Sequence, residues 1–292
     1  MTDDAPLLRT LALAQTNPVF GEVEANLDAV EALIADLQAD LLVLPEFFAS
    51  GYSFRDRAEG LALAESFEDG PTVERLLTWS RQTGGVIVAG YPEREGDRLY
   101  NAAAVVANGE RLRSYRKIHL FGFEGDVFDP GDRPFEVIEH DGMRVGTMIC
   151  FDWMFPESAR TLALRGADVI AHPSNLVLPG WCQRAMCIRA LENRVFTVTS
   201  NRYGEEARTP RPTLRFTGAS RIADPHGQVV EDAPDAGDAL LRTTVDIRRS
   251  RDKQIPSGNR LFLERRPAFY ADSPSANERR SPESPSNGAS RN

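Results

Sequence analysis

Residues 145–156 read VGTMICFDWMFP, and a helical pattern that opens at Pro156 continues through Arg165. The apolar run 145–150 favours a strand. A strand, a tight junction and a helix in this order place Cys150 at a strand end, beside a helix N-terminus. A thiol there can be held as the thiolate, the form that attacks a carbonyl or nitrile carbon. The alternative interpretation is a buried core cysteine.

Strand-like and helix-like segments alternate along the rest of the chain. The hydrophobic pattern predicts helices at 21–38, 72–83, 156–165 and 181–193. It predicts strands at 7–15, 40–45, 85–90, 100–107, 111–116, 146–150, 167–171, 195–200, 215–223, 228–231 and 239–245. This alternation indicates the α/β class. We expect one domain over residues 1–271 and a disordered polar tail at 272–292, which is rich in Ser, Pro, Asn and Arg.

Composition limits the classes of partner and the compartment. The formal net charge of −9 disfavours nucleic acid and anionic membranes as partners. The acidic N-terminus is unlike a signal peptide, and no apolar run is long enough to span a bilayer. Three cysteines form no even disulfide framework, so a reducing cytoplasm is expected. No metal-ligand cluster or dinucleotide fingerprint is present, and we predict no cofactor.

Three strand-like segments end in a reactive or charged group. Residues 41–45 lead to Glu46, residues 114–116 to Lys117 and residues 146–149 to Cys150. Active sites of open α/β sheets lie at strand ends. A carboxylate can move the thiol proton, and an ammonium group can stabilise an oxyanion, so the three groups together suit amide hydrolysis.

The segments around these residues resemble the signature blocks of the nitrilase superfamily of carbon–nitrogen hydrolases. The three main blocks are LPEF at 44–47, YRKIHLF at 115–121 and GTMICFDWMFPE at 146–157. Supporting blocks are HPSN at 172–175, RALENR at 189–194 and DPHG at 224–227. Each block alone is a weak signal, but three in the right order with matching spacing are strong. The resemblance extends from about residue 8 to about residue 270.

This resemblance implies a fold and a set of residue roles. The fold is a four-layer α-β-β-α sandwich of the nitrilase type. Glu46 is the general base and acid, Lys117 stabilises the oxyanion, and Cys150 is the nucleophile that forms a thioester. The backbone N–H of Phe151 completes the oxyanion hole. Glu124, which precedes a Pro-Gly pair, is the candidate that orients Lys117 or the substrate amide.

The substrate is the least determined part of the prediction. The pair Phe151-Asp152 after the nucleophile resembles amidase, ω-amidase and carbamoylase branches, so the leading hypothesis is a small aliphatic amide that releases ammonia. The alternatives are a nitrilase of small aliphatic nitriles, an N-carbamoyl amidohydrolase and a catalytically silent metabolite-binding module. The intact Glu46, Lys117 and Cys150 argue against the silent module. Tyr52 and Asn175, in loops expected to set specificity, are candidates for substrate binding.

Other residues favour simpler interpretations. His172 follows a predicted strand and suggests a Cys–His protease, but the resemblance uses a glutamate as base and His172-Pro173 is typical of a turn. His119 is expected to be structural. Cys182 and Cys187 are expected to pack in the interior, with Cys182 possible near the pocket. The resemblance also implies a homodimer or a higher homo-oligomer.

Overall fold

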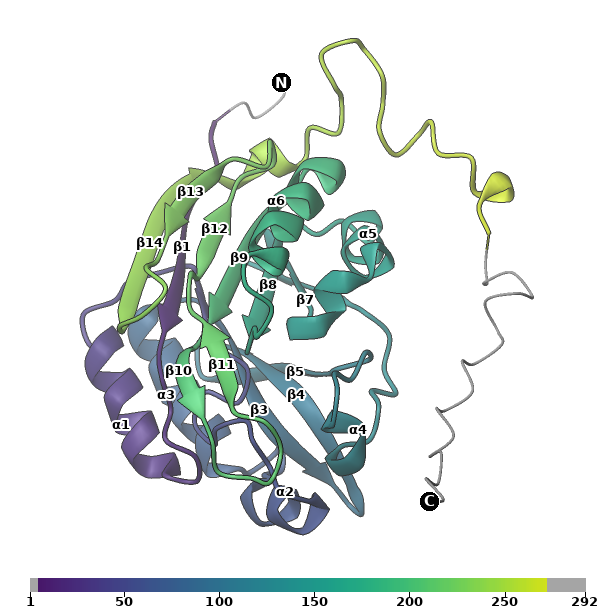
Figure 1. Ribbon diagram of the computed structural model, residues 1–292. Coiled ribbons are helices and arrows are strands. Elements are labelled where there is room, and N and C mark those ends of the chain that lie inside the picture. Colours follow the sequence, from purple (N-terminus) through teal and green to yellow (C-terminus); the bar gives the residue numbers. More distant parts are fainter. Residues whose placement is uncertain (1–4, 272–292) are drawn as a thin grey trace, which may run out of the picture. The chain divides into compact units, whose positions relative to one another are not determined.

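Two six-stranded mixed sheets carry the fold, as seen in the computed structural model, which describes residues 5–271 (Figure 1). Residue contacts divide the chain into one unit that ends at Asp252 and another that begins at Lys253. Both sheets lie in the first unit. The described part of the second unit contains one 3₁₀ turn, Pro267–Phe269. The tail predicted at 272–292 lies outside the described residues.

The two sheets share one plan, in which three parallel strands are flanked by antiparallel ones. In the first sheet β1, β2 and β3 are parallel, and in the second β7, β8 and β9 are parallel. The first sheet has the order β14 (Ala239–Asp246), β1 (Leu8–Gln15), β2 (Leu41–Val43), β3 (Val86–Glu95), β4 (Arg98–Ala107), β5 (Glu110–Arg116). The second has the order β13 (Val229–Asp232), β12 (Arg221–Ala223), β9 (Phe196–Asn201), β8 (Val169–Ser174), β7 (Met143–Thr147), β6 (Val137–His140).

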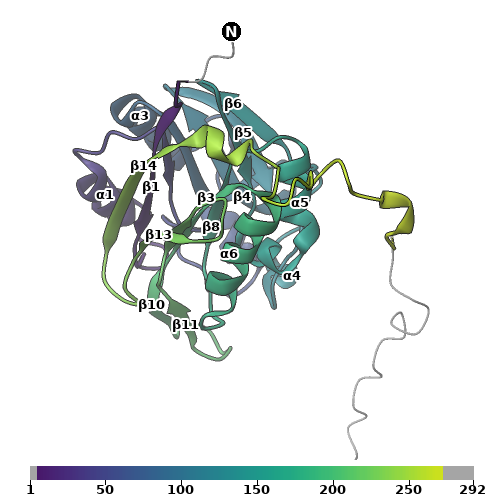
Figure 2. The same ribbon diagram turned by 90° about the horizontal axis from the view of Figure 1, so that it is seen from above.

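Helices cover the outer face of each sheet, and the inner faces pack on each other. Helices α1 (Val23–Ile34) and α3 (Pro71–Thr83) contact the first sheet, and α5 (Pro156–Leu164) and α6 (Trp181–Asn193) contact the second. Strands β1, β2 and β3 meet β8 and β9 across the middle (Figures 1 and 2). The predicted four-layer α-β-β-α arrangement is confirmed. Short elements complete the chain: α2 (Arg57–Leu63), α4 (Glu124–Val127), β10 (Tyr203–Glu206), β11 (Leu214–Thr217) and the 3₁₀ turns Cys150–Met154 and Ile247–Ser250.

Helix α3 shows how local sequence produces these elements. Pro71 opens it, where the fixed φ of proline suits the first turn and no N–H is needed. Gly84 ends it in a left-handed conformation and donates its N–H to the Ser80 carbonyl. Val73 and Leu76 are fully buried against the first sheet. Each such side chain contributes roughly 1.5–3 kcal/mol by leaving water.

Three local predictions were wrong. The strand predicted at 215–223 is two strands, β11 and β12, because Gly218 and Ala219 between them adopt left-handed φ values of 54° and 50°. The strand predicted at 146–150 ends at Thr147, and Cys150 opens a 3₁₀ turn. His172-Pro173 is not a turn but a buried part of β8, where the lack of a proline N–H is tolerated and the parallel pairing to β9 continues.

Within residues 5–271, no helix combines the length and the apolar character needed to cross a bilayer.

Candidate active site

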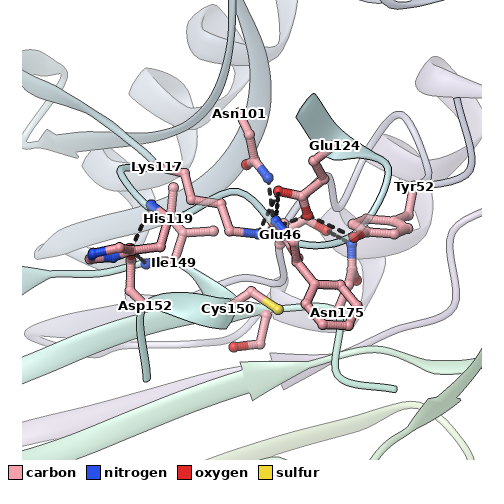
Figure 3. Close-up of polar contacts among 12 residues, drawn as sticks. Glu46, Tyr52, Asn101, Lys117, His119, Glu124, Ile149, Cys150, Asp152 and Asn175 are labelled. Carbon is pink, nitrogen blue, oxygen red and sulfur yellow. Dashed lines mark hydrogen bonds and ion pairs between the residues drawn. The ribbon is translucent and has the colours of Figure 1, made fainter. Parts of the chain in front are cut away.

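Glu46, Lys117 and Cys150 meet between the two sheets, although each follows a different strand (Figure 3). Lys117 Nζ lies 2.8 Å from Glu46 Oε1, and it also donates to both oxygens of Glu124, at 2.8 and 2.9 Å. The side chains of Glu46, Lys117 and Glu124 are at most 1% exposed, and Cys150 is 5% exposed. The structure therefore brings the four residues predicted as catalytic into one buried cluster.

A close approach of two backbones positions Glu46. The Gly90 N–H of β3 donates to the Pro45 carbonyl, and a Cβ at Gly90 would lie 2.4 Å from Glu46 Cα. Only glycine permits this contact. Asn101 Nδ2 of β4 donates to Glu46 Oε1 at 2.7 Å. We did not predict Asn101 as a site residue, but the sequence signal was there, because it is a lone amide in the apolar run 99–107.

The turn that carries the nucleophile is held by Asp152. Cys150 has a φ of +39°, a left-handed conformation that costs a non-glycine residue free energy and is often found at functional sites. Asp152 Oδ2 accepts hydrogen bonds from the Ile149 N–H at 2.9 Å and the Tyr115 hydroxyl at 2.7 Å. Its Oδ1 accepts from His119 Nδ1 at 2.7 Å. His119 thus has the structural place expected of it, and Asp152 was not expected to organise the turn.

Burial determines the resting protonation of the site. Burial raises the pKa of Glu46 above its ordinary 4.5, although Lys117 opposes the shift. Burial and the Glu46 carboxylate raise the pKa of Cys150 well above 9.0. For Lys117 burial lowers the pKa, but the carboxylates of Glu124 and Glu46 outweigh it and raise the pKa. These shifts favour a resting thiol at Cys150 over the thiolate that a helix N-terminus can hold.

His172 is not placed to act as a base for Cys150. Its Nε2 lies 2.9 Å from the Cys150 backbone carbonyl, which only accepts, so Nε2 carries the proton. Its Nδ1 lies 3.1 Å from the hydroxyl of Thr199. Burial lowers the pKa of His172 to about 4, which keeps the ring neutral. The Cys–His alternative is thereby excluded.

Glu124 collects donors from three directions. Besides Lys117, the Tyr52 hydroxyl donates to Oε1 at 2.6 Å and the Phe121 N–H donates to Oε2 at 3.1 Å. Tyr52 is 2% exposed, and burial together with the Glu124 and Glu46 carboxylates raises its pKa well above 10.0. Tyr52 therefore contacts the site through Glu124, whose two carboxylate oxygens both accept from Lys117 Nζ.

Asn175 contacts the base and lies beside the nucleophile (Figure 3). Its Nδ2 donates to the Glu46 backbone carbonyl at 2.8 Å, and it lines the same cavity as Cys150. Figure 3 shows Asn175 beside Cys150. The side chain is 3% exposed and lines the cavity next to the nucleophile.

The cavity at Cys150 is small and apolar. Its empty volume is about 280 Å³, open solvent included, which is at the lower limit of ordinary small-molecule sites. The lining consists of Phe121, Cys150, Phe151, Trp153, Asn175, Leu176, Val177, Leu178 and Cys182. No charged side chain belongs to it, and the predicted position of Cys182 near the pocket is confirmed.

No group of three or more His, Cys, Asp or Glu side chains in the described part of the chain is arranged to hold a metal ion.

Comparison with known proteins agrees with this geometry. Residues 10–253 match the carbon-nitrogen hydrolase family. A nitrilase of Pyrococcus abyssi is 46% identical over 263 residues, which cover 89% of this chain and 98% of that protein. An N-carbamoylputrescine amidase of Arabidopsis thaliana is 30% identical over 271 residues, covering 85% and 90%. The crystal structure of an amidase from Nesterenkonia sp. superposes with a TM-score of 0.70 at 28% identity, covering 84% of this chain and 92% of that one.

Proposed function

This chain belongs to the carbon–nitrogen hydrolase family of the nitrilase superfamily, and from that premise we propose that it hydrolyses a small aliphatic amide to a carboxylate and ammonia. The observation that carries the proposal is the buried cluster of Glu46, Lys117, Glu124 and Cys150 beside an apolar cavity. The small cavity and its uncharged lining favour a short, uncharged acyl group.

The first half of the reaction forms a thioester. Glu46 takes the proton of the Cys150 thiol as the sulfur bonds to the amide carbon, and the carbonyl π electrons move to oxygen. The Lys117 ammonium and the Phe151 N–H stabilise this oxyanion. The C–N bond then breaks, the leaving nitrogen takes the proton from Glu46, and ammonia departs. Glu124, as the partner of Lys117, keeps the ammonium group directed at the oxyanion.

The second half returns the enzyme to its resting state. Glu46 takes a proton from water as the water oxygen bonds to the thioester carbon, and the same two donors hold the new oxyanion. The C–S bond breaks, and the sulfur takes the proton back from Glu46. The resting thiol is restored. The raised pKa of Glu46 suits both directions of this transfer, because a base is most effective when its pKa lies near the working pH.

A nitrile is the second candidate substrate, and the 46% identity to a nitrilase supports it. The same thiol can add to a nitrile carbon, with the negative charge then forming on nitrogen. A carbamoyl substrate is favoured by the similarity to an N-carbamoylputrescine amidase. The cavity lining supports it less, because none of the residues that form it is acidic and could pair with an amine.

An ammonia-release screen of short amides, short nitriles and carbamoyl compounds tests the proposal. We expect release from short amides, loss of release in Cys150→Ala, and a covalent adduct mass on Cys150 in the wild type. Unchanged release in Cys150→Ala would sink the nucleophile assignment. A wild type that is inert on the whole panel, yet binds a metabolite tightly, would favour the silent binding module.

We also propose a homodimer. Helices α5 and α6, which contact each other, expose the large apolar side chains of Leu164, Trp181, Ile188 and Leu191. A second copy of the chain is the occupant that the implied pairing requires. Light scattering should give a mass twice that of one chain. Ile188→Glu should lower the measured mass towards that of a single chain, and a wild-type monomer would contradict the proposal.

We further propose that the protein works in the reducing cytoplasm, which its three free cysteines, one of them the nucleophile, support.

A further inference from the structure

Asn101 is bonded to both the base and the lysine of the site. It lies in β4 and is fully buried. Its Nδ2 donates to Glu46 Oε1 at 2.7 Å, and its backbone carbonyl accepts the Lys117 N–H at 2.8 Å (Figure 3). Because an ionised carboxylate only accepts, the nitrogen of the amide is the end that faces Glu46. One residue of β4 thus joins two residues that follow other strands, β2 and β5.

The other end of the Asn101 amide costs the fold stability. Its Oδ1 is buried and accepts no hydrogen bond from residues 5–271. The remaining side chains of 99–107 are apolar, apart from the Tyr100 hydroxyl. An apolar residue at position 101 would therefore avoid a buried acceptor without a partner. Departures of this kind from a well-packed apolar strand are typical of residues that serve a site.

The two oxygens of Glu46 differ in what they bond. Oε1 accepts from Lys117 Nζ at 2.8 Å and from Asn101 Nδ2 at 2.7 Å. Oε2 is also buried and has no partner among the described residues. A carboxylate oxygen offers about two lone pairs, so the two donors fill Oε1 and leave Oε2 open. The proton that Glu46 takes from the Cys150 thiol in the proposed reaction therefore binds at Oε2.

We infer that Asn101 is a positioning residue for the base: its bond to Oε1 fixes the Glu46 carboxylate so that Oε2 exchanges the proton with Cys150. This inference rests on the proposed function, in which Glu46 is the base. The same bond favours the ionised form of Glu46, so it opposes the rise in pKa that burial causes. The other titratable groups whose charge acts on this carboxylate come from other segments and stay in place when Asn101 is replaced: Lys117, Glu124, Tyr52 and Cys150.

Asn101→Leu tests this role, because leucine is similar in size and removes the donor together with the unpaired acceptor. With propionamide as substrate, kcat should fall by roughly tenfold, since a misplaced base transfers protons less well, and KM should change by less than about threefold. The acid limb of the kcat/KM profile should move up by about one pH unit, because the Glu46 carboxylate loses a hydrogen bond that favours its charged form. Asn101→Ala should give the same shift and replaces the leucine variant if that variant does not fold.

Val105→Ala is the matched control. Val105 lies on the same face of β4 as Asn101, is also buried, and has no polar side-chain atom. Its truncation should lower Tm and leave the acid limb within about 0.2 pH units of the wild type. A folded Asn101→Leu whose acid limb does not move would overturn the inference, and so would an equal shift in Val105→Ala.

The reaction of Cys150 with methyl methanethiosulfonate separates a failure of this inference from a failure of the proposed function. The mass of the methylthio adduct on Cys150 gives a rate that needs no substrate. Because Glu46 takes the thiol proton here as well, the acid limb of this rate should also move up by about one pH unit in Asn101→Leu. A wild type inert on every amide, nitrile and carbamoyl compound would overturn the proposed function, and the adduct rate would still decide the role of Asn101. An active enzyme with an unmoved acid limb in both assays would overturn this inference alone.

Discussion

At the scale of single residues, the site is a group of charges that the fold holds at a cost. With both carboxylates ionised, Glu46 and Glu124 carry two negative charges and Lys117 one positive charge, so the buried cluster has a net charge of −1. Burying charge is unfavourable unless it is fully paired, and one oxygen of Glu46 has no partner among residues 5–271. Reactivity and stability therefore conflict at Glu46.

Glu46→Gln should make the chain more stable and nearly inactive. The pKa of Glu46 is raised in the fold, so its contribution to stability is present below pH 4.5 and is lost as pH rises through the folded pKa. A neutral Gln removes the cost of burying the carboxylate charge at pH 7 and so raises the free energy of unfolding. Each kcal/mol of that increase raises Tm by about 2–4 °C for a chain of this size. The kcat should fall by roughly 10²–10⁴-fold, the usual contribution of a general base.

Calorimetry at pH 7 and pH 4 measures this effect, which should shrink at the lower pH. Glu59→Gln is the control with the opposite sign, because a hydrogen bond from Arg208 lowers the pKa of Glu59 and its ionised form stabilises the fold. A lower Tm for Glu46→Gln at pH 7 would show that its bonds to Lys117 and Asn101 outweigh the burial cost.

The pH dependence of the activity should reflect the ionisation of Glu46, Cys150 and Lys117. The reaction starts from a Glu46 carboxylate, a Cys150 thiol and a Lys117 ammonium. Since the Glu46 pKa is raised, kcat/KM should fall on the acid side at a pH above 4.5. Since the pKa values of Cys150 and Lys117 are raised above 9.0 and 10.5, no loss is expected between pH 7 and 9. A profile of kcat/KM at constant ionic strength measures this, and an alkaline loss near pH 8 would contradict it.

At the scale of elements, the short 3₁₀ turn Cys150–Met154 determines how the nucleophile is presented. The fully buried Asp152 carboxylate accepts hydrogen bonds from Ile149, Tyr115 and His119. Both of its oxygens are therefore already bonded to groups of the protein itself. The Cys-aromatic-Asp pattern that suggested amide hydrolysis thus acts through the shape of the turn and not through a bond from Asp152 to the substrate.

Asp152→Asn should loosen this turn. The amide nitrogen of the new Asn side chain cannot accept a hydrogen bond, so at least one of the donors that now bond Asp152 would lose its acceptor. The turn would then direct the Phe151 N–H less well at the oxyanion. We expect kcat to fall by roughly 10- to 100-fold, as when one oxyanion donor is weakened. Steady-state kinetics and Tm measure the two effects. Glu157→Gln, which alters an exposed acid in the first turn of α5, is the control and should change neither.

At the scale of the whole molecule, the site depends on a contact between segments that follow different sheets. Glu206, in β10, accepts hydrogen bonds from the backbone N–H groups of Tyr52 at 3.2 Å and Ser53 at 2.6 Å, and it pairs with the buried Arg202. Tyr52 follows β2 of the first sheet, and Arg202 follows β9 of the second. The Glu206–Arg202 pair thus holds the segment whose Tyr52 hydroxyl bonds Glu124.

Glu206→Gln should lower kcat by about tenfold, because it weakens the hydrogen bond to the Tyr52 backbone N–H. In a chain that already carries Tyr52→Phe, the same substitution should lower kcat by much less. This double-mutant cycle distinguishes an effect carried by the hydroxyl from general destabilisation. Asp168→Asn removes the charge of another buried acid, paired with Arg144 and Arg251, and should lower Tm without changing kcat. Additive losses in the cycle would contradict the proposed connection.

The sequence by itself determined the α/β class, most element positions and the choice of Glu46, Lys117 and Cys150, each of which follows a strand. These depend on local hydrophobic pattern and on short motifs, which a linear chain displays directly. The predictions failed where a turn replaced a strand end, at Cys150, and where a strand continued through His172-Pro173, because neighbouring segments decided both.

The tertiary structure alone decided the chemistry at each atom. The bonds to Glu46 join residues 55, 71 and 129 positions apart, from Asn101, Lys117 and Asn175. Whether Cys150 rests as a thiol, and whether one oxygen of Glu46 stays unpaired, depends on burial and on which atoms those distant partners occupy. Desolvation and hydrogen-bond pairing are properties of the packed interior, so no local pattern in the chain encodes them.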